Sequence, residues 1–182
     1  MSTSFPGFFG PTVGTEVPLE MLAACHIRIE RQCSTLRRLA VHLAKHGAND
    51  EARRAAVNIM RYFDTSALQH HQDEEDNLFP ALLESMAGSD PVCLREMTQG
   101  LTEDHRKLES MWHHLRQALG KVVAGEPALL PTDEIEAFVG LYERHTKLEE
   151  DELFPMAARL LSDAELDRIG HAMRVRRGIQ NV

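Results

Sequence analysis

The chain has 182 residues, of which 43% are hydrophobic, and its 20 basic and 28 acidic side chains leave a net charge of −8. This length and apolar content suffice for one or two folded domains, and the acidic balance argues against a general nucleic-acid binder. The three cysteines, Cys25, Cys33 and Cys93, fit no zinc or disulfide spacing, which favours a reducing compartment. With no signal peptide or membrane span in the pattern, we expect a cytoplasmic protein without a membrane partner.

Residues 1–17 are rich in glycine, proline and phenylalanine and have no periodic pattern, so we expect an irregular N-terminal arm. The rest of the chain has apolar residues at alternating steps of three and four, which predicts amphipathic helices. The predicted helices cover residues 18–46, 51–86, 91–122, 133–161 and 163–174. They indicate an all-α, up-down-up-down four-helix bundle over residues 18–161, followed by a short C-terminal helix and basic tail over 162–182.

Each of the four long apolar stripes contains one histidine in place of an apolar residue: His26, His70, His105 and His145. One such histidine would usually be a core residue with a hydrogen-bond partner. In an antiparallel hairpin, however, two residues face each other when the turn lies midway between them. The midpoints of successive histidines fall on predicted turns near residues 48, 88 and 125. The sequence therefore predicts four imidazoles at one level of the bundle core.

Two of these histidines have a glutamate four residues later: Glu74 follows His70, and Glu149 follows His145. Positions i and i+4 share one helix face, so each pair can reach one centre. Six buried polar side chains without partners would be costly, and metal cations remove that cost. Imidazole and carboxylate ligands suit Fe, Zn, Mn or Cu, and two carboxylates able to bridge favour a binuclear site.

The two halves of the predicted bundle repeat each other. The segments HHQDEEDNLFP (residues 70–80) and HTKLEEDELFP (residues 145–155) match at seven of eleven positions. The segments that begin at His26 and His105 also share a glutamate four residues on. The chain therefore resembles two copies of one helical hairpin, related by a pseudo-two-fold axis through the metal centre.

These paired motifs closely resemble the hemerythrin-like (HHE cation-binding) family over about residues 19–160. The resemblance implies a four-helix bundle that holds two iron ions joined by an oxo or hydroxo bridge. It implies terminal ligands at His26, His70, His105 and His145, and bridging carboxylates at Glu74 and Glu149. Oxygen-carrying hemerythrins have a second histidine where this chain has Glu109, so the pattern is more similar to the branch with four histidines and two glutamates.

That branch includes di-iron proteins that repair oxidative or nitrosative damage to iron–sulphur clusters. The resemblance therefore implies a protein that binds or reduces a small gaseous or peroxide ligand (O₂, NO or H₂O₂), in sensing or stress protection, with an unknown electron donor. One alternative is a non-catalytic module that stores iron or reports iron or oxygen status. Another is a metal-free bundle for protein interaction, which would leave the buried polar cluster uncompensated.

Further polar residues near the motifs have roles that the sequence leaves open. Glu30 and Glu109 are either additional ligands or solvated carboxylates. Tyr142 either packs in the core with one hydrogen bond or acts on a metal-bound ligand. Glu75 and Glu150 are placed to accept the second N–H of a neighbouring ligand histidine.

Other residues are expected to be structural or solvent-exposed. The histidines outside the stripes are expected at the surface: His71, His113, His114 and His171. The basic end at Arg174–Arg177 is expected to be a solvated helix terminus. Pro80 and Pro155 are expected to kink their helices.

Overall fold

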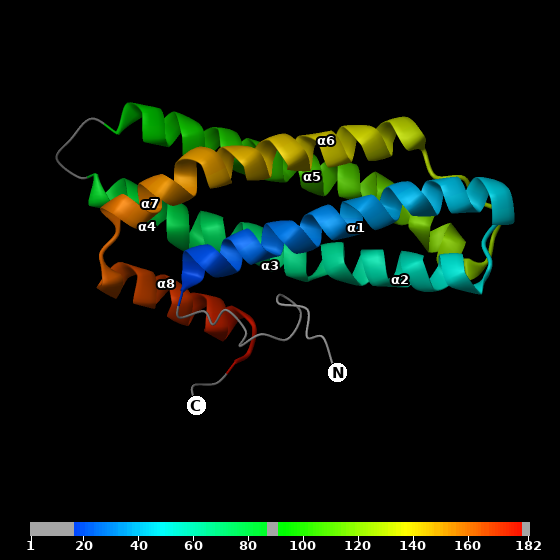
Figure 1. The fold of residues 1–182 in the computed structure, drawn as a ribbon, viewed down its shortest axis with the longest axis horizontal. Helices are drawn as coiled ribbons and strands as arrows, with labels where there is room; N and C mark the ends of the chain where they lie inside the picture. Colours follow the sequence, from blue (N-terminus) through cyan, green and yellow to red (C-terminus); the bar gives the residue numbers. More distant parts are fainter. Residues whose placement is uncertain (1–16, 87–90, 180–182) are drawn as a thin grey trace, which may run out of the picture.

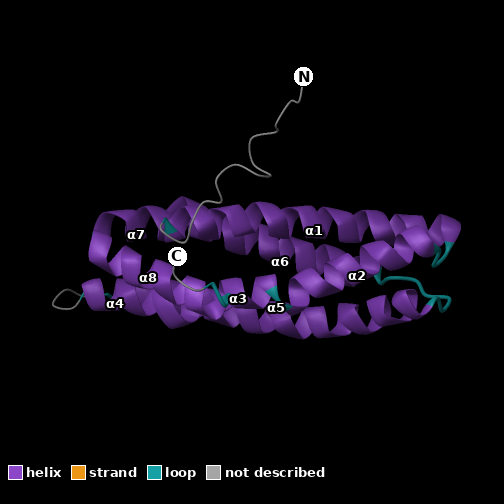
Figure 2. Cartoon of the chain, turned by 90° about the horizontal axis from the view of Figure 1, so that it is seen from below, coloured by secondary structure: helices purple, strands orange, loops and turns teal. Residues whose placement is uncertain are grey.

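The computed structural model describes residues 17–86 and 91–179, so the expected irregular arm lies outside the described residues except for Val17. All regular elements of the described residues are helical (Figure 2). In chain order they are α1 (Pro18–His46), α2 (Asp50–Asp64), α3 (Ser66–Asp73), η1 (Glu74–Leu78), α4 (Phe79–Ser85), α5 (Val92–Ala124), α6 (Thr132–Leu148), η2 (Glu149–Leu153), α7 (Phe154–Leu160) and α8 (Asp163–Arg176).

These elements form four rods that lie side by side, with successive rods antiparallel (Figure 1). The first rod is α1, the second runs from α2 to α4, the third is α5, and the fourth runs from α6 to α7. The helix α1 packs against α2 and α6, and α5 packs against the same two helices. Chain neighbours are thus spatial neighbours around a ring, which confirms the predicted four-helix bundle. The short helix α8 lies outside this ring against α1, α3 and η1 (Figure 1).

The helix ends follow from local sequence. Gly47 and Gly125 have φ angles of 65° and 75° just after α1 and α5, a region that favours glycine. The side chain of Asn49 caps the start of α2. At the start of α8, Ser162 and Glu165 form a reciprocal capping box. These terminators set the turn positions and therefore the level at which residues of neighbouring helices meet.

The predicted continuous helix 51–86 is interrupted at Thr65, between α2 and α3. The Thr65 hydroxyl donates a 2.6 Å hydrogen bond to the carbonyl of Arg61. The Thr65 N–H instead donates to the carbonyl of Tyr62, at 3.3 Å. A threonine side chain that occupies the carbonyl four residues back competes with the helical backbone bond, and this accounts for the break.

Both rods that carry the repeated motif contain a π-helical turn, η1 or η2, directly before the Phe-Pro pair. The N–H of Phe79 donates to the carbonyl of Glu74, and that of Phe154 donates to the carbonyl of Glu149, five residues back in each case. The sequence predicted a proline kink and not this wider turn. Single π turns are frequent at functional sites, and each of these begins at a predicted ligand.

The apolar core consists of two clusters with a polar layer between them. One cluster, which includes Phe63, Leu115 and Phe138, fills the half of the bundle formed by α2 and the ends of α1, α5 and α6. The other, which includes Leu78 and Leu153, fills the half formed by α4, α7 and α8. Along each rod the stripe histidine stands between members of the two clusters. The candidate site is therefore enclosed by hydrocarbon at both ends.

Candidate metal centre

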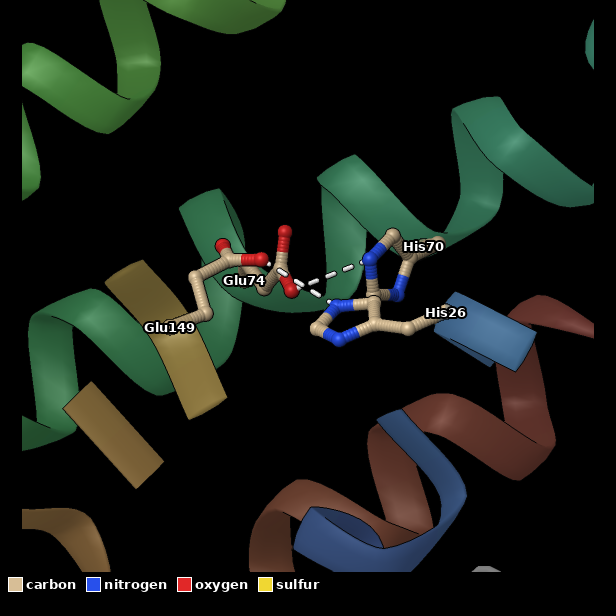
Figure 3. A group of neighbouring side chains, drawn as sticks. All are labelled: His26, His70, Glu74 and Glu149. Carbon is tan, nitrogen blue, oxygen red and sulfur yellow. Dashed lines mark ion pairs between the residues drawn. The ribbon is translucent and has the colours of Figure 1, made fainter. Parts of the chain in front are cut away.

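The structure brings all six predicted ligands together, with each histidine on a different rod. All six side chains are buried: His26, His70, Glu74, His105, His145 and Glu149. Figure 3 shows four of them, His26, His70, Glu74 and Glu149, with their polar ends turned toward one another. That these side chains bind metal stays a prediction, but their convergence is the geometry that the prediction requires.

Each buried carboxylate lies between histidines of two rods. One oxygen of Glu74 is 3.2 Å from Nε2 of His70, and the other is 3.4 Å from Nε2 of His105. One oxygen of Glu149 is 3.2 Å from Nε2 of His145, and the other is 3.1 Å from Nε2 of His26. The two glutamates therefore occupy equivalent bridging places, as the internal repeat suggests.

These contacts define two groups of four potential ligands. One contains His26 and His70 and the other contains His105 and His145, and both contain Glu74 and Glu149, with the ligand atoms of each group within 4.8 Å of one another. The two groups share both carboxylates. Each group offers two imidazoles and two carboxylates, which are ligand types that bind transition-metal cations.

The hydrogen bonding of the cluster is incomplete without a cation. Among the described residues, buried atoms without a hydrogen-bond partner include all four oxygens of Glu74 and Glu149, both ring nitrogens of His70, and Nε2 of His26. Native interiors rarely leave such atoms unpaired, because each costs free energy. The donor set therefore fits metal cations, which would bind the carboxylate oxygens and the imidazole lone pairs together.

Two outer carboxylates orient this donor set, as predicted. Nδ1 of His26 lies 2.8 Å from Glu150, and Nδ1 of His105 lies 2.7 Å from Glu75. When Nδ1–H donates to a carboxylate, the Nε2 lone pair of a neutral imidazole points inward. There Nε2 of His26 faces an oxygen of Glu149, and Nε2 of His105 faces an oxygen of Glu74. A proton or a metal cation therefore has to lie between each nitrogen and its carboxylate oxygen.

The pKa shifts of the buried histidines and glutamates have two causes: burial, and the charges of neighbouring members of the cluster. Burial disfavours the ionised forms of Glu74 and Glu149 alike. The charge of Glu149 adds to burial and raises the pKa of Glu74 well above its usual value. For Glu149, His145 and His26 outweigh burial and lower its pKa. Burial lowers the pKa of His70 well below its usual value. Metal binding would therefore displace protons from this cluster.

The possible additional site residues, Glu30, Glu109 and Tyr142, lie outside both ligand groups. Glu30 is exposed on α1, and Glu109 is bound by Arg106 at the surface of α5. Tyr142 is only 4% exposed and packs against Phe63 and Phe138. Its hydroxyl makes no hydrogen bond within the described residues, in contrast to the expected single bond.

His71 is not a surface residue, and that prediction was wrong. Its side chain is 3% exposed, and its ring stacks on His105 with the centroids 4.0 Å apart. Burial lowers the pKa of His71 well below its usual value. The buried face of the second rod is wide enough to include the position after His70. The periodic sequence pattern marks only one residue per turn, so it did not indicate that His71 is buried. The surface prediction is confirmed for His113, His114 and His171.

The basic chain end is also more buried than predicted. Arg176, the last residue of α8, and Arg177, which follows it, both bind the carboxylate of Asp73, which is fully buried beside Glu74. Arg176 also pairs with Asp76, at 2.9 Å. The prediction of a solvated helix end was wrong at these two arginines, because the sequence pattern does not show which surface α8 covers.

Comparisons with known proteins agree with this geometry. Residues 17–157 match the model of the hemerythrin HHE cation-binding domain. The chain belongs to the hemerythrin HHE family. It is also 33% identical over 163 residues to an uncharacterized protein of Haemophilus influenzae, a match that covers 90% of this chain and 91% of that protein. In the part of this HHE protein that the structure describes, no helix is long and apolar enough to cross a membrane.

Proposed function

We propose that this metal-binding HHE protein is a non-haem di-iron protein that binds or reduces a small oxidant, O₂, NO or peroxide, in sensing or in protection against oxidative and nitrosative stress. Repair of damaged iron–sulphur clusters is one such role. The three cysteines are free, which supports work in a reducing compartment. An electron donor of unknown identity would complete any turnover.

The observation that carries this proposal is the set of unpaired buried atoms shared by the two ligand groups. His26 and His70 would hold one iron ion, His105 and His145 the other, and Glu74 and Glu149 would bridge them. Bound iron would supply one-electron redox chemistry and coordination positions that the protein leaves open for a small ligand. The unpaired atoms argue against the metal-free interaction bundle, which would have to bury them uncompensated.

The surrounding residues would prepare the site for such a ligand. Glu75 and Glu150 hold the imidazoles of His105 and His26 in one orientation. The buried Leu78 and Leu153 of the two π turns exclude water from one side of the polar layer. A dry, oriented site favours binding of small neutral molecules over hydration of the metals.

The test is metal content per chain after expression with added iron, followed by exposure of the reduced protein to each oxidant. We expect about two iron ions per chain and a near-ultraviolet charge-transfer band. Consumption of NO, O₂ or peroxide beyond one equivalent per centre would support turnover. Consumption that stops at one equivalent would favour the non-catalytic iron module. Less than about half a metal ion per chain after reconstitution would contradict the proposal.

A further inference from the structure

A cavity of about 490 Å³ lies between α1 and α6, beside the ligand cluster. Figure 1 shows these two helices side by side along the bundle. Its walls include Ile29 and Cys33 of α1 and Val139 of α6. Because one water molecule takes up about 30 Å³ of liquid, this space holds several small molecules.

Two of the buried residues that line the cavity are His26 and Tyr142. His26 is a predicted ligand whose Nε2 lies 3.1 Å from Glu149, so the cavity reaches the outer side of the ligand cluster. Tyr142 is 4% exposed, and no described residue hydrogen-bonds its hydroxyl. A buried phenol normally has a polar partner. A hydroxyl without one, on the wall of a cavity, is a donor available to a bound molecule.

The solvent-exposed rim of the cavity is acidic. Glu30, Glu143 and Glu150 line it, together with a single basic residue, Arg37. The guanidinium of Arg37 is already paired with Glu143, at 3.0 Å, and with Glu136, at 2.7 Å. The local charge is therefore negative. Such a rim repels anions and leaves uncharged molecules unaffected.

From this geometry we propose that the cavity is the binding and access site for a small uncharged molecule that accepts a hydrogen bond, with hydrogen peroxide as the ligand it fits best. The Tyr142 hydroxyl donates to the bound molecule, and the carboxylates of Glu30, Glu143 and Glu150 exclude anions. Among the three oxidants named above, O₂ and NO are also uncharged but are weak hydrogen-bond acceptors. This inference rests on the proposed function, since it names the substrate of that same centre.

The first test blocks the cavity. Ser34 is exposed and lines the cavity on α1, so Ser34→Trp would fill its outer end. The matched control is Ser110→Trp, an exposed serine on α5 that lines a separate groove. With unchanged iron content in both variants, we expect Ser34→Trp to slow azide binding to the oxidised protein and peroxide reaction with the reduced protein by about tenfold or more. Ser110→Trp should leave both rates unchanged.

The second test separates charge from size. In Glu30→Lys, the association rate of the azide anion should rise about tenfold at low salt, and the gain should disappear at high salt. The rate with uncharged peroxide should not change. Equal changes for azide and peroxide, or none for either, would contradict a charge-selective rim.

The third test removes the hydroxyl of Tyr142. Tyr142→Phe keeps the ring, so iron content and the absorption band should be retained. The peroxide concentration that gives half the maximal rate should rise about five- to tenfold, as expected for one lost hydrogen bond. Reduction of one peroxide to two waters would consume two protons from solvent and two electrons, which reduced iron held by the two ligand groups would supply.

The outcomes distinguish the two proposals. A protein that binds no iron, or whose reduced form does not react with peroxide, overturns the proposed function. A protein that binds iron and reacts with peroxide, but whose Ser34→Trp and Tyr142→Phe variants behave as the parent does, overturns the assignment of this cavity and leaves the proposed function standing.

Discussion

The two repeated segments carry the same predicted ligands but differ in what surrounds them. Three residues after the ligand histidine, the first repeat has Asp73 and the second has Leu148. Asp73 binds Arg176 and Arg177 at the end of α8, whereas Leu148 packs against the apolar cluster. Three residues before the histidine, Ala67 of the first repeat is replaced by Tyr142 in the second, which lines the α1–α6 cavity.

The matching positions include the predicted ligands, whereas two of the differing positions, Asp73 and Tyr142, contact the end of α8 and the α1–α6 cavity. The first repeat is closed by α8, which packs on α3 and η1. The second repeat borders a cavity that reaches His26. The two repeats therefore carry matching candidate ligands but have different surroundings.

The largest effects should come from the predicted ligands, because they test whether the two half-sites are equivalent. Glu149→Ala removes a shared ligand and should abolish binding of both metal ions. His70→Ala and His145→Ala each remove a ligand from one group only, and each should leave about one metal ion per chain. All three variants should lower the thermal midpoint of the iron-loaded protein, since bound metal stabilises the fold.

Plasma mass spectrometry measures the metal content of each variant, and thermal unfolding of the iron-loaded samples measures the change in stability. His70→Ala and His145→Ala serve as controls for each other, because equivalent half-sites predict equal losses of metal in the two variants. Full iron content in any of the three variants would contradict the assignment of that residue.

A smaller effect is expected where the repeats differ most. Asp73→Leu gives the first repeat the type of residue that the second one has, but it leaves Arg176 and Arg177 without their shared buried partner. We expect a loss of about 3 kcal/mol in the free energy of unfolding, because removing one member of a buried ion pair leaves desolvated charge behind. Urea unfolding measures the change.

The matched control is Asp76→Asn, at the exposed carboxylate that pairs with the same Arg176. An exposed pair contributes little, so the cost should stay below about 1 kcal/mol. Similar losses for the two variants would show that α8 is not held by the buried carboxylate.

The smallest effects should come from the outer carboxylates, which the two repeats share. Glu75→Gln and Glu150→Gln should each weaken metal affinity about 10- to 100-fold, as measured by competition with a chelator, because a ligand imidazole loses the partner that orients it. Glu75 should have the larger effect, since its side chain is 20% exposed against 49% for Glu150. A larger effect at Glu150 would contradict this order.

Much of the molecule could be predicted from the sequence because the relevant signals are local or periodic. The helix ranges follow from apolar periodicity and from terminators such as Gly47 and Gly125. The convergence of four histidines follows from the turn positions, and the roles of Glu75 and Glu150 follow from their place beside the bridging glutamates. Periodicity indicates which face of a helix is buried, and the turn positions determine which residues of neighbouring helices lie at the same level of the bundle.

Other features depended on which surfaces meet in space. The burial of His71, the pairing of Asp73 with Arg176 and Arg177, and the unpaired hydroxyl of Tyr142 have no local signature. Each depends on packing between elements far apart in the chain, such as α8 on α3 or α1 beside α6. The sequence by itself therefore determined the bundle and the candidate ligand set. Only the tertiary structure decided what covers that set and which cavity lies beside it, because contacts between distant helices are set by shape complementarity of whole surfaces.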